Sequence, residues 1–249
     1  MQLPSDAAPG AARDRLSVTW LGHSTFRMRS PKGVRMLIDP WLSTNPSCPT
    51  SARRFDNADV LDLMLVTHGH SDHCGDAVSV GRKTGATVVA SYELAGWLER
   101  QGLKNLRPMN IGGRQTLSGI EIAMVQAVHS SSVMDEGTIV YLGPATGFMI
   151  TFENGLTIYF AGDTGLFGDM RMLRERYAPA IAFLPIGDRY TMGPEDAAVA
   201  AEWLGVRKIV PMHYGTFPEL TGTPDKLREC CRPKSIDVLE LRPGETLVI

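Results

Sequence analysis

The stretch "LVTHGHSDHCGD", residues 65–76, holds three of the six histidines of this 249-residue chain within six positions. It continues the apolar run "LDLML", which is short, is followed by polar residues and therefore predicts a buried strand. A loop at the end of such a strand is held at its base by the sheet and presents its side chains rigidly. Its central motif "HGHSDH" brings together four polar side chains: His68, His70, Asp72 and His73.

These side chains have the chemistry of metal ligands. Histidine nitrogen and carboxylate oxygen bind zinc, iron, manganese and nickel. On an extended backbone His68 and His70 point the same way, whereas Asp72 and His73 follow the turn and can face a second ion. With six histidines in 249 residues, chance produces this spacing on the order of one time in a thousand. The motif therefore predicts a metal site.

Three more candidate ligands end apolar segments elsewhere in the chain. His129 ends "IEIAMVQAVH", Asp163 ends "LTIYFAGD" and His213 ends "KIVPMH". Each is followed by small or polar residues, as at the end of a buried strand. Polar groups at the ends of several buried strands would converge on one edge of the sheets, so we expect these residues to join the cluster.

The pattern of segments indicates an α/β protein. Each half of the chain contains buried strands and amphipathic helices that can cover them. Asn154-Gly155, between two apolar runs in "FENGLTIYF", predicts a tight hairpin. The economical arrangement is two packed sheets with helices on both outer faces. No Pro-, Gly- or Ser-rich linker divides the chain, so we expect a flexible N-terminal arm over residues 1–14 and a single domain over residues 15–249.

Composition excludes several classes of protein. The formal net charge is −2 and no dense Lys/Arg run occurs, so we expect no nucleic-acid partner. No apolar stretch approaches the roughly 20 residues that span a bilayer, and the N-terminus lacks the apolar centre of a signal peptide. The four cysteines make no disulfide scaffold in a chain this long. We therefore expect a cytoplasmic protein with reduced thiols, a small-molecule substrate, for which an anion is one option, and no membrane partner; homo-oligomers are compatible with exposed sheet edges.

The order HxHxDH, His, Asp, His resembles the metallo-β-lactamase superfamily, from about Arg15 to the C-terminus. Further phrases resemble a metal-dependent hydrolase branch akin to L-ascorbate-6-phosphate lactonases: "WLGHSTF", "LIDPWLS", "HSSS", "GFMITFENGLTIYFAGDTGLFGDM", "LPIGDRYTMGPEDAA" and "VPMHYGTFP". The resemblance implies a four-layer αββα sandwich with mixed sheets and a dinuclear metal site along one edge. It implies no particular substrate.

The resemblance also implies a division of the ligands. It assigns His68, His70 and His129 to a first metal ion. It assigns Asp72, His73 and His213 to a second ion, and Asp163 to a bridging position. The implied cofactors are two divalent ions, zinc first, with manganese, nickel or iron as alternatives.

These cofactors imply a hydrolase that uses a metal-bridging hydroxide on a small-molecule ester, lactone or phosphoester, because two close divalent ions can activate a shared water near neutral pH. A lactone is favoured, on family analogy alone. The alternatives are a phosphodiesterase, a di-iron redox protein of the same fold and a non-catalytic metal-binding protein. Asp72 is expected to receive or orient the water proton.

Four further residues are candidates for catalysis or substrate binding. His23 follows a strand and could support a ligand or touch substrate, with an ordinary hydrogen-bonded histidine as the alternative. Tyr214 could stabilise an oxyanion or simply pack. Arg189 and Tyr190 precede a predicted helix N-terminus, where an anionic group would be favoured. Cys74 is interpreted as a packing residue and not a ligand.

Overall fold

A computed structural model describes residues 14–55 and 60–249. The expected N-terminal arm falls almost entirely outside the described residues, so the domain boundary at residue 15 stays a prediction. Two seven-stranded sheets and a separate two-stranded hairpin make up the β-structure. No helix in the described ranges is both long and apolar enough to cross a bilayer.

The first sheet has the strand order β16-β1-β2-β3-β4-β5-β6. Neighbouring strands from β16 to β3 pair antiparallel, whereas neighbouring strands from β3 to β6 pair parallel. The metal-ligand motif follows β4, near the middle of this sheet. The strands are β1 Ser17–Trp20, β2 Phe26–Arg29, β3 Arg35–Ile38, β4 Leu63–Leu65, β5 Thr87–Ser91, β6 Leu106–Met109 and β16 Thr246–Val248.

The second sheet has the order β15-β14-β13-β12-β11-β8-β7. Strands β12 to β15 run parallel, and β11 pairs antiparallel with both β8 and β12. The predicted hairpin at Asn154-Gly155 is confirmed, with Gly155 at φ +84. The strands are β7 Arg114–Leu117, β8 Ile120–Gln126, β11 Thr146–Thr151, β12 Thr157–Phe160, β13 Ile181–Pro185, β14 Lys208–Met212 and β15 Asp237–Val238.

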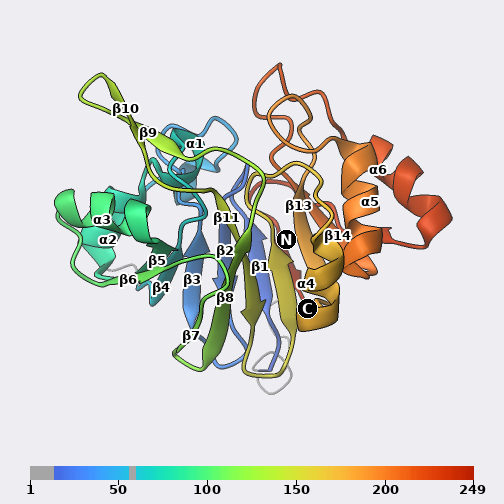
Figure 1. Cartoon of the computed structure of the whole chain (residues 1–249), viewed down its shortest axis with the longest axis horizontal. Helices are drawn as coiled ribbons and strands as arrows, with labels where there is room; N and C mark the ends of the chain where they lie inside the picture. The colour runs from blue at the N-terminus through green and yellow to red at the C-terminus, as the bar shows by residue number, and fades with distance from the viewer. Residues whose placement is uncertain (1–13, 56–59) are drawn as a thin grey trace, which may run out of the picture.

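Helices cover the outer faces of the two sheets (Figure 1). Helices α2 and α3 share a buried cluster with β4 and β5. On the other side, α5 packs against β13, α6 against β15 and α4 against α5. The expected four-layer αββα sandwich is confirmed. The helices are α1 Ser71–Cys74, α2 Ala77–Thr84, α3 Tyr92–Arg100, α4 Met170–Tyr177, α5 Pro194–Leu204 and α6 Pro224–Cys231, with short 3₁₀ turns η1 Thr50–Ala52 and η2 Arg232–Lys234.

The main core lies between the sheets. Phe26 of the first sheet meets Phe160 and Phe183 of the second edge-on, with ring centroids 5.8 and 5.1 Å apart. All three rings are fully buried. Burying one such side chain contributes about 1.5–3 kcal/mol, so the two sheets are held firmly against each other. The strand ends that carry the candidate ligands therefore start from a rigid platform.

Five short elements have weak sequence signals. Strand β6 contains Pro108 and lies at a sheet edge, where proline is tolerated. Strand β7 is largely polar. Residues 71–74, expected to be loop, form the single-turn helix α1. The segment "VMDEGTIVYLGP" contains most of a β-hairpin, β9 Ser132–Asp135 paired with β10 Thr138–Tyr141.

Candidate metal centre

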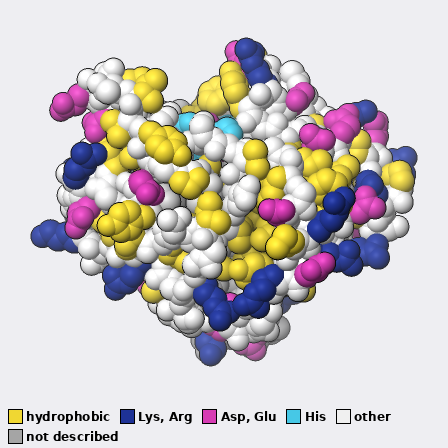
Figure 2. All heavy atoms as spheres, viewed as in Figure 1, with side chains coloured by type: hydrophobic (Ala, Val, Ile, Leu, Met, Phe, Trp, Pro, Cys, Tyr) yellow, Lys and Arg dark blue, Asp and Glu magenta, His cyan; other side chains and the backbone are white. Residues whose placement is uncertain are grey.

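All six histidines and two aspartates meet at one edge of the sandwich. They follow β1, β4, β8, β12 and β14, and the C-terminal ends of these strands lie on the same side of the molecule (Figure 1). Figure 2 shows histidine side chains at the bottom of a notch in this edge. The predicted convergence of strand-end residues is therefore what the structure shows. The residues fall into two groups that share a carboxylate.

The first group consists of His68, His70 and His129. Nε2 of His68 lies 3.0 Å from Nδ1 of His70, and Nε2 of His129 lies 3.3 Å from that same atom. Nitrogens bound tetrahedrally to one zinc at about 2.0–2.1 Å would be about 3.3 Å apart. Burial lowers the pKa of each of these histidines and favours the neutral imidazole that a metal requires.

The second group consists of Asp72, His73 and His213, joined by His23. Oδ2 of Asp72 lies 3.7 Å from Nε2 of His213 and 4.0 Å from Nε2 of His73. Asp72 and His73 belong to α1, so this single helical turn directs both side chains toward the end of β14. One carboxylate and at least two imidazoles can therefore face one ion here.

Asp163 lies between the two groups. Its Oδ2 atom is 3.0 Å from Nε2 of His213 and 3.1 Å from Nε2 of His73. The same atom is 3.8 Å from Nε2 of His68 and 3.6 Å from Nε2 of His129. One carboxylate oxygen thus approaches imidazoles of both groups, as a bridging ligand would.

The electrostatics of the second group favour a cation. Burial alone would lower the pKa of His73, but the charges of Asp163, Asp39 and Asp72 raise it well above its usual value. Nε2 of His73 and Oδ1 of Asp163 are buried and lack a hydrogen-bond partner. An unpartnered buried polar atom costs about 1–3 kcal/mol. A metal ion would supply positive charge and ligand bonds at this point, so the donor set fits metal binding.

Asp39 supports the cluster from below. Its Oδ2 atom is 2.8 Å from Nδ1 of His73 and accepts a hydrogen bond from the Thr67 hydroxyl, and Oδ1 accepts from the Thr67 backbone N–H. The Thr67 hydroxyl can then accept from Nδ1 of His68, 3.0 Å away. Such carboxylate contacts fix which nitrogen of a ligand histidine faces the metal. In the sequence Asp39 directly precedes Pro40, as is typical of a turn, and the structure adds its contact with His73.

His23 is placed within the second group. Its Nε2 lies 3.0 Å from Oδ2 of Asp72, and its Nδ1 lies 2.9 Å from the Thr216 hydroxyl. Burial, followed by the nearby His213, lowers the pKa of His23 to about 4, so the ring is neutral at pH 7. Because the Asp72 carboxylate can only accept, the neutral ring carries its proton on Nε2 and donates it to Asp72, which leaves Nδ1 to accept from the Thr216 hydroxyl. Thr216 has no signal in the sequence.

The backbone of this region is strained. His23 and His213 are non-glycine residues in the left-handed region, both at φ +56. The N–H of His213 donates to the carbonyl of His23 at 3.0 Å, which ties the β1–β2 turn of one sheet to the end of β14 in the other. Gly187, which follows β13, also lies against His213. A Cβ at residue 187 would be 2.2 Å from the carbonyl oxygen of His213, so only glycine fits there. Such strain concentrates at functional sites.

The remaining candidates lie outside these groups. The Tyr214 ring stacks on Trp20 at 5.2 Å, and burial together with the Glu240 charge raises its pKa. Of the two roles considered for Tyr214, this placement favours packing. Arg189 and Tyr190 are exposed on the β13–α5 loop, whose Met192 N–H donates to the carbonyl of Thr164 next to Asp163.

Cys74 is buried, its thiol donates to the carbonyl of Gly69 at 2.9 Å, and burial raises its pKa to about 12. A protonated, hydrogen-bonded thiol is not a metal ligand. All four cysteines are free.

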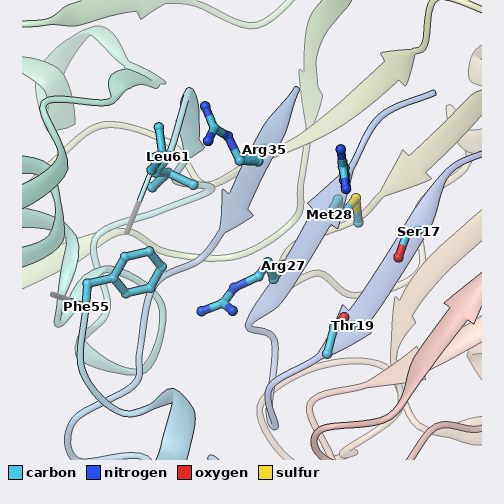
Figure 3. A pocket seen from close by; sticks show the side chains of 9 residues that line it. Ser17, Thr19, Arg27, Met28, Arg35, Phe55 and Leu61 are labelled. Carbon is cyan, nitrogen blue, oxygen red and sulfur yellow. The ribbon is translucent and has the colours of Figure 1, made fainter. Parts of the chain in front are cut away.

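A pocket of about 240 Å³ lies elsewhere, on the outer face of the first sheet (Figure 3). There Arg27 lies over the Phe55 ring at 5.2 Å, and Arg35 pairs with Asp62. None of the residues that line it belongs to the histidine cluster. The strand-end cluster and the notch above it therefore form the candidate site.

Comparisons with known proteins agree with this geometry. A family model described as "Beta-lactamase superfamily domain" matches residues 34–214. A "UPF0173 metal-dependent hydrolase" of Koribacter versatilis is 49% identical and covers 93% of this chain and 97% of its own. One of the same description from Rubrobacter xylanophilus is 46% identical, covering 92% and 95%. The solved structure of Igni18, a metallo hydrolase from Ignicoccus hospitalis, has a TM-score of 0.84 and 36% identity, covering 94% of this chain and 98% of that one.

Proposed function

This chain belongs to the metallo-β-lactamase superfamily, and on that premise we propose that it is a metal-dependent hydrolase with two divalent ions at the strand-end cluster. The observation that carries the proposal is the position of Asp163, whose Oδ2 atom lies 3.0–3.8 Å from four histidine nitrogens drawn from both groups. The first ion would be held by His68, His70 and His129, and the second by Asp72, His73 and His213.

Divalent ions, when bound, supply Lewis acidity and lower the pKa of water enough to furnish a nucleophile at neutral pH. The chain then needs no nucleophilic serine or cysteine, and the protonated Cys74 thiol is unsuited to that role. Zinc is the first choice of metal because the donors are imidazole and carboxylate. Manganese, nickel and iron accept the same donors.

Asp72 has the geometry of a proton acceptor. Its side chain is 25% exposed, whereas those of His23 and Asp163 are almost completely buried, so it faces the notch through which substrate enters. Its Oδ2 atom is held by the donated Nε2 proton of His23, and Thr216 holds the His23 tautomer. His23 is therefore a positioning residue, which leaves the other oxygen of Asp72 free to orient or accept a proton.

The proposed reaction is hydrolysis of a small-molecule ester, lactone or phosphoester, with a lactone favoured. The motifs shared with the L-ascorbate-6-phosphate lactonase branch support the lactone. Asp72 accepts the proton that water loses as it adds to the carbonyl carbon, and returns it to the ring oxygen as the carbon–oxygen bond of the ring breaks, so that the product carries a hydroxyl and a carboxylic acid. Arg189 and Tyr190, exposed on the β13–α5 loop, are the residues we propose for contact with the substrate.

The test is reconstitution of the metal-free chain with zinc, manganese or iron, followed by assays against lactones, carboxylic esters and phosphodiesters. We expect about two ions per chain, lactone opening, and loss of activity on chelation that added metal restores. Full activity of the metal-free chain would refute the proposal. Turnover restricted to phosphodiesters would indicate a phosphodiesterase, and a stoichiometric pair of irons with a visible absorption band and no hydrolysis would indicate redox chemistry.

A further inference from the structure

We propose that the substrate carries an apolar group, an aliphatic chain or an aromatic ring, which lies against the outer face of the β9–β10 hairpin. The inference rests on the proposed function and narrows its substrate class. It begins from three large apolar side chains on this hairpin that are unusually exposed: Met134 at 67%, Ile139 at 69% and Tyr141 at 70%.

The two faces of the hairpin differ. Val133 and Val140 pair across the strands and pack on the cluster that contains α3, and Asp135 accepts a hydrogen bond from Trp97 of α3 at 2.8 Å. Met134 pairs with Ile139 on the opposite face, because side chains alternate along a strand. The hairpin is thus anchored through one face, and the face turned away from α3 is apolar and uncovered.

The base of the hairpin contacts the metal-ligand loop, residues 68–73. The N–H of Gly69, between His68 and His70, donates to the Ser131 hydroxyl at 3.0 Å. A Cβ on Gly69 would lie 2.9 Å from the Leu142 side chain, so the base of the hairpin and this loop are in close contact. Met134 lies only two residues, about 7 Å along the strand, beyond Ser132. A Cβ on Gly69 would also lie 3.1 Å from the carbonyl oxygen of Ser132, so the apolar face begins about two residues from the metal-ligand loop.

Aromatic side chains form the other wall of the notch. The Phe217 ring is 37% exposed and lies 5.7 Å from the His23 ring and 5.8 Å from the Trp41 ring. Tyr190 is 52% exposed on the neighbouring β13–α5 loop. Figure 2 shows hydrophobic side chains on both sides of the notch that contains the histidines. A substrate whose reactive group reaches the cluster would pass between apolar surfaces.

The charges around the notch disfavour a phosphorylated substrate. The hairpin carries two acidic residues at its tip, Asp135 and Glu136, and no Lys or Arg. The loops of the other wall, residues 187–193 and 214–222, carry Asp188, Glu219 and a single cation, Arg189. Carboxylates repel a phosphate dianion, and one exposed arginine offsets them only in part. An uncharged substrate with an apolar substituent suits these surfaces better.

The test compares a short and a long lactone, γ-butyrolactone and γ-decalactone, on the metal-loaded chain. The variant M134S/I139T removes apolar surface and retains a β-branched residue at position 139. We expect its preference for γ-decalactone over γ-butyrolactone, as the ratio of kcat/KM values, to fall about tenfold. Y141S is a second variant with the same expected direction. M172S is the matched control, because Met172 is a methionine of similar exposure, 64%, on α4.

Binding provides a readout that does not need turnover. Decanoate should bind the metal-loaded chain more tightly than butyrate does, and M134S/I139T should reduce that difference while M172S retains it. If no lactone or ester is hydrolysed, the proposed function fails. Calorimetry with decanoate and butyrate then still tests whether the outer face of the β9–β10 hairpin binds an apolar chain. An unchanged chain-length preference in both hairpin variants, with thermal melting as in the parent, would overturn the inference. A dimer that M134S/I139T dissociates without altering the preference would overturn it too and would assign this face to a second copy of the chain.

Discussion

The two ligand groups differ in how firmly the protein holds them. In the second group, His73 contacts Asp39, and Asp72 contacts His23, which is itself held by Thr216. In the first group, His68 has a partner in Thr67, but no hydrogen bond among the described residues supports the second ring nitrogen of His70 or His129.

The groups also differ in charge and exposure. The second group is rich in carboxylates and its histidines are almost fully buried, whereas the first consists of imidazoles alone, of which His129 is 15% exposed. Electrostatic attraction and hydrogen-bonded ligands both strengthen metal binding. We therefore expect the second group to hold its ion more tightly, and the first group to exchange its ion more readily.

The largest effect should come from the ligand that the groups share. Asp163→Asn removes the negative charge that four histidines surround. We expect loss of both ions and a fall in kcat/KM of at least about a thousandfold, because metal chemistry is lost with them. Metal content by mass spectrometry and lactone assays measure this. Asp169→Asn, an exposed aspartate before α4, is the control. Retention of two tightly bound ions by Asp163→Asn would contradict a bridging role.

Asp39→Asn tests the support of the second group. The amide cannot replace the carboxylate beside Nδ1 of His73, and loss of such a partner lowers metal affinity about 10- to 100-fold. We expect zinc titrations with a competing chelator to show one weakened ion and one that changes less. Equal weakening of both ions would mean that Asp39 acts on the two groups alike, through Thr67 as well as His73.

A pH titration should separate the groups without mutation. Because the nearby carboxylates raise the pKa of His73, protons compete with zinc for the metal-free second group, so the zinc affinity of this group should rise with pH. The pKa values of His68, His70 and His129 are lowered, so protons compete little for the first group. Calorimetry in buffers of different ionisation enthalpy counts the protons released. Release of the same number of protons on binding of each ion would contradict the expected difference between the two ligand groups.

The smallest expected effect belongs to Thr216→Val, which removes the hydroxyl that holds the His23 tautomer. We expect kcat to fall about fivefold, within the range of a lost hydrogen bond, while KM and metal content stay unchanged. The acidic limb of the pH–kcat profile should move to higher pH, because a weaker hydrogen bond from His23 raises the pKa of Asp72. Thr221→Val, in the same loop, is the control. A change in metal content would mean that His23 itself binds the second ion.

Much of the fold was predictable because its signals are local. Short apolar runs marked the central strands, and Asn154-Gly155 marked a hairpin that the structure confirms. The edge strands β6 and β7 were not predicted, because β6 contains Pro108 and β7 is mostly polar. The role of Tyr214 was left open by its position next to His213, and only the stacking on Trp20 favours packing.

By itself, the sequence determined the strand-end positions of the candidate ligands and their chemical types, because hydrophobic periodicity and residue identity are properties of neighbouring residues. The tertiary structure alone decided that one oxygen of Asp163 approaches both groups, that Asp39 and Thr216 support them, and that one face of the β9–β10 hairpin is uncovered. These relations join residues as far as 193 positions apart. They depend on strand register and on the packing of one sheet against the other, which no local pattern encodes.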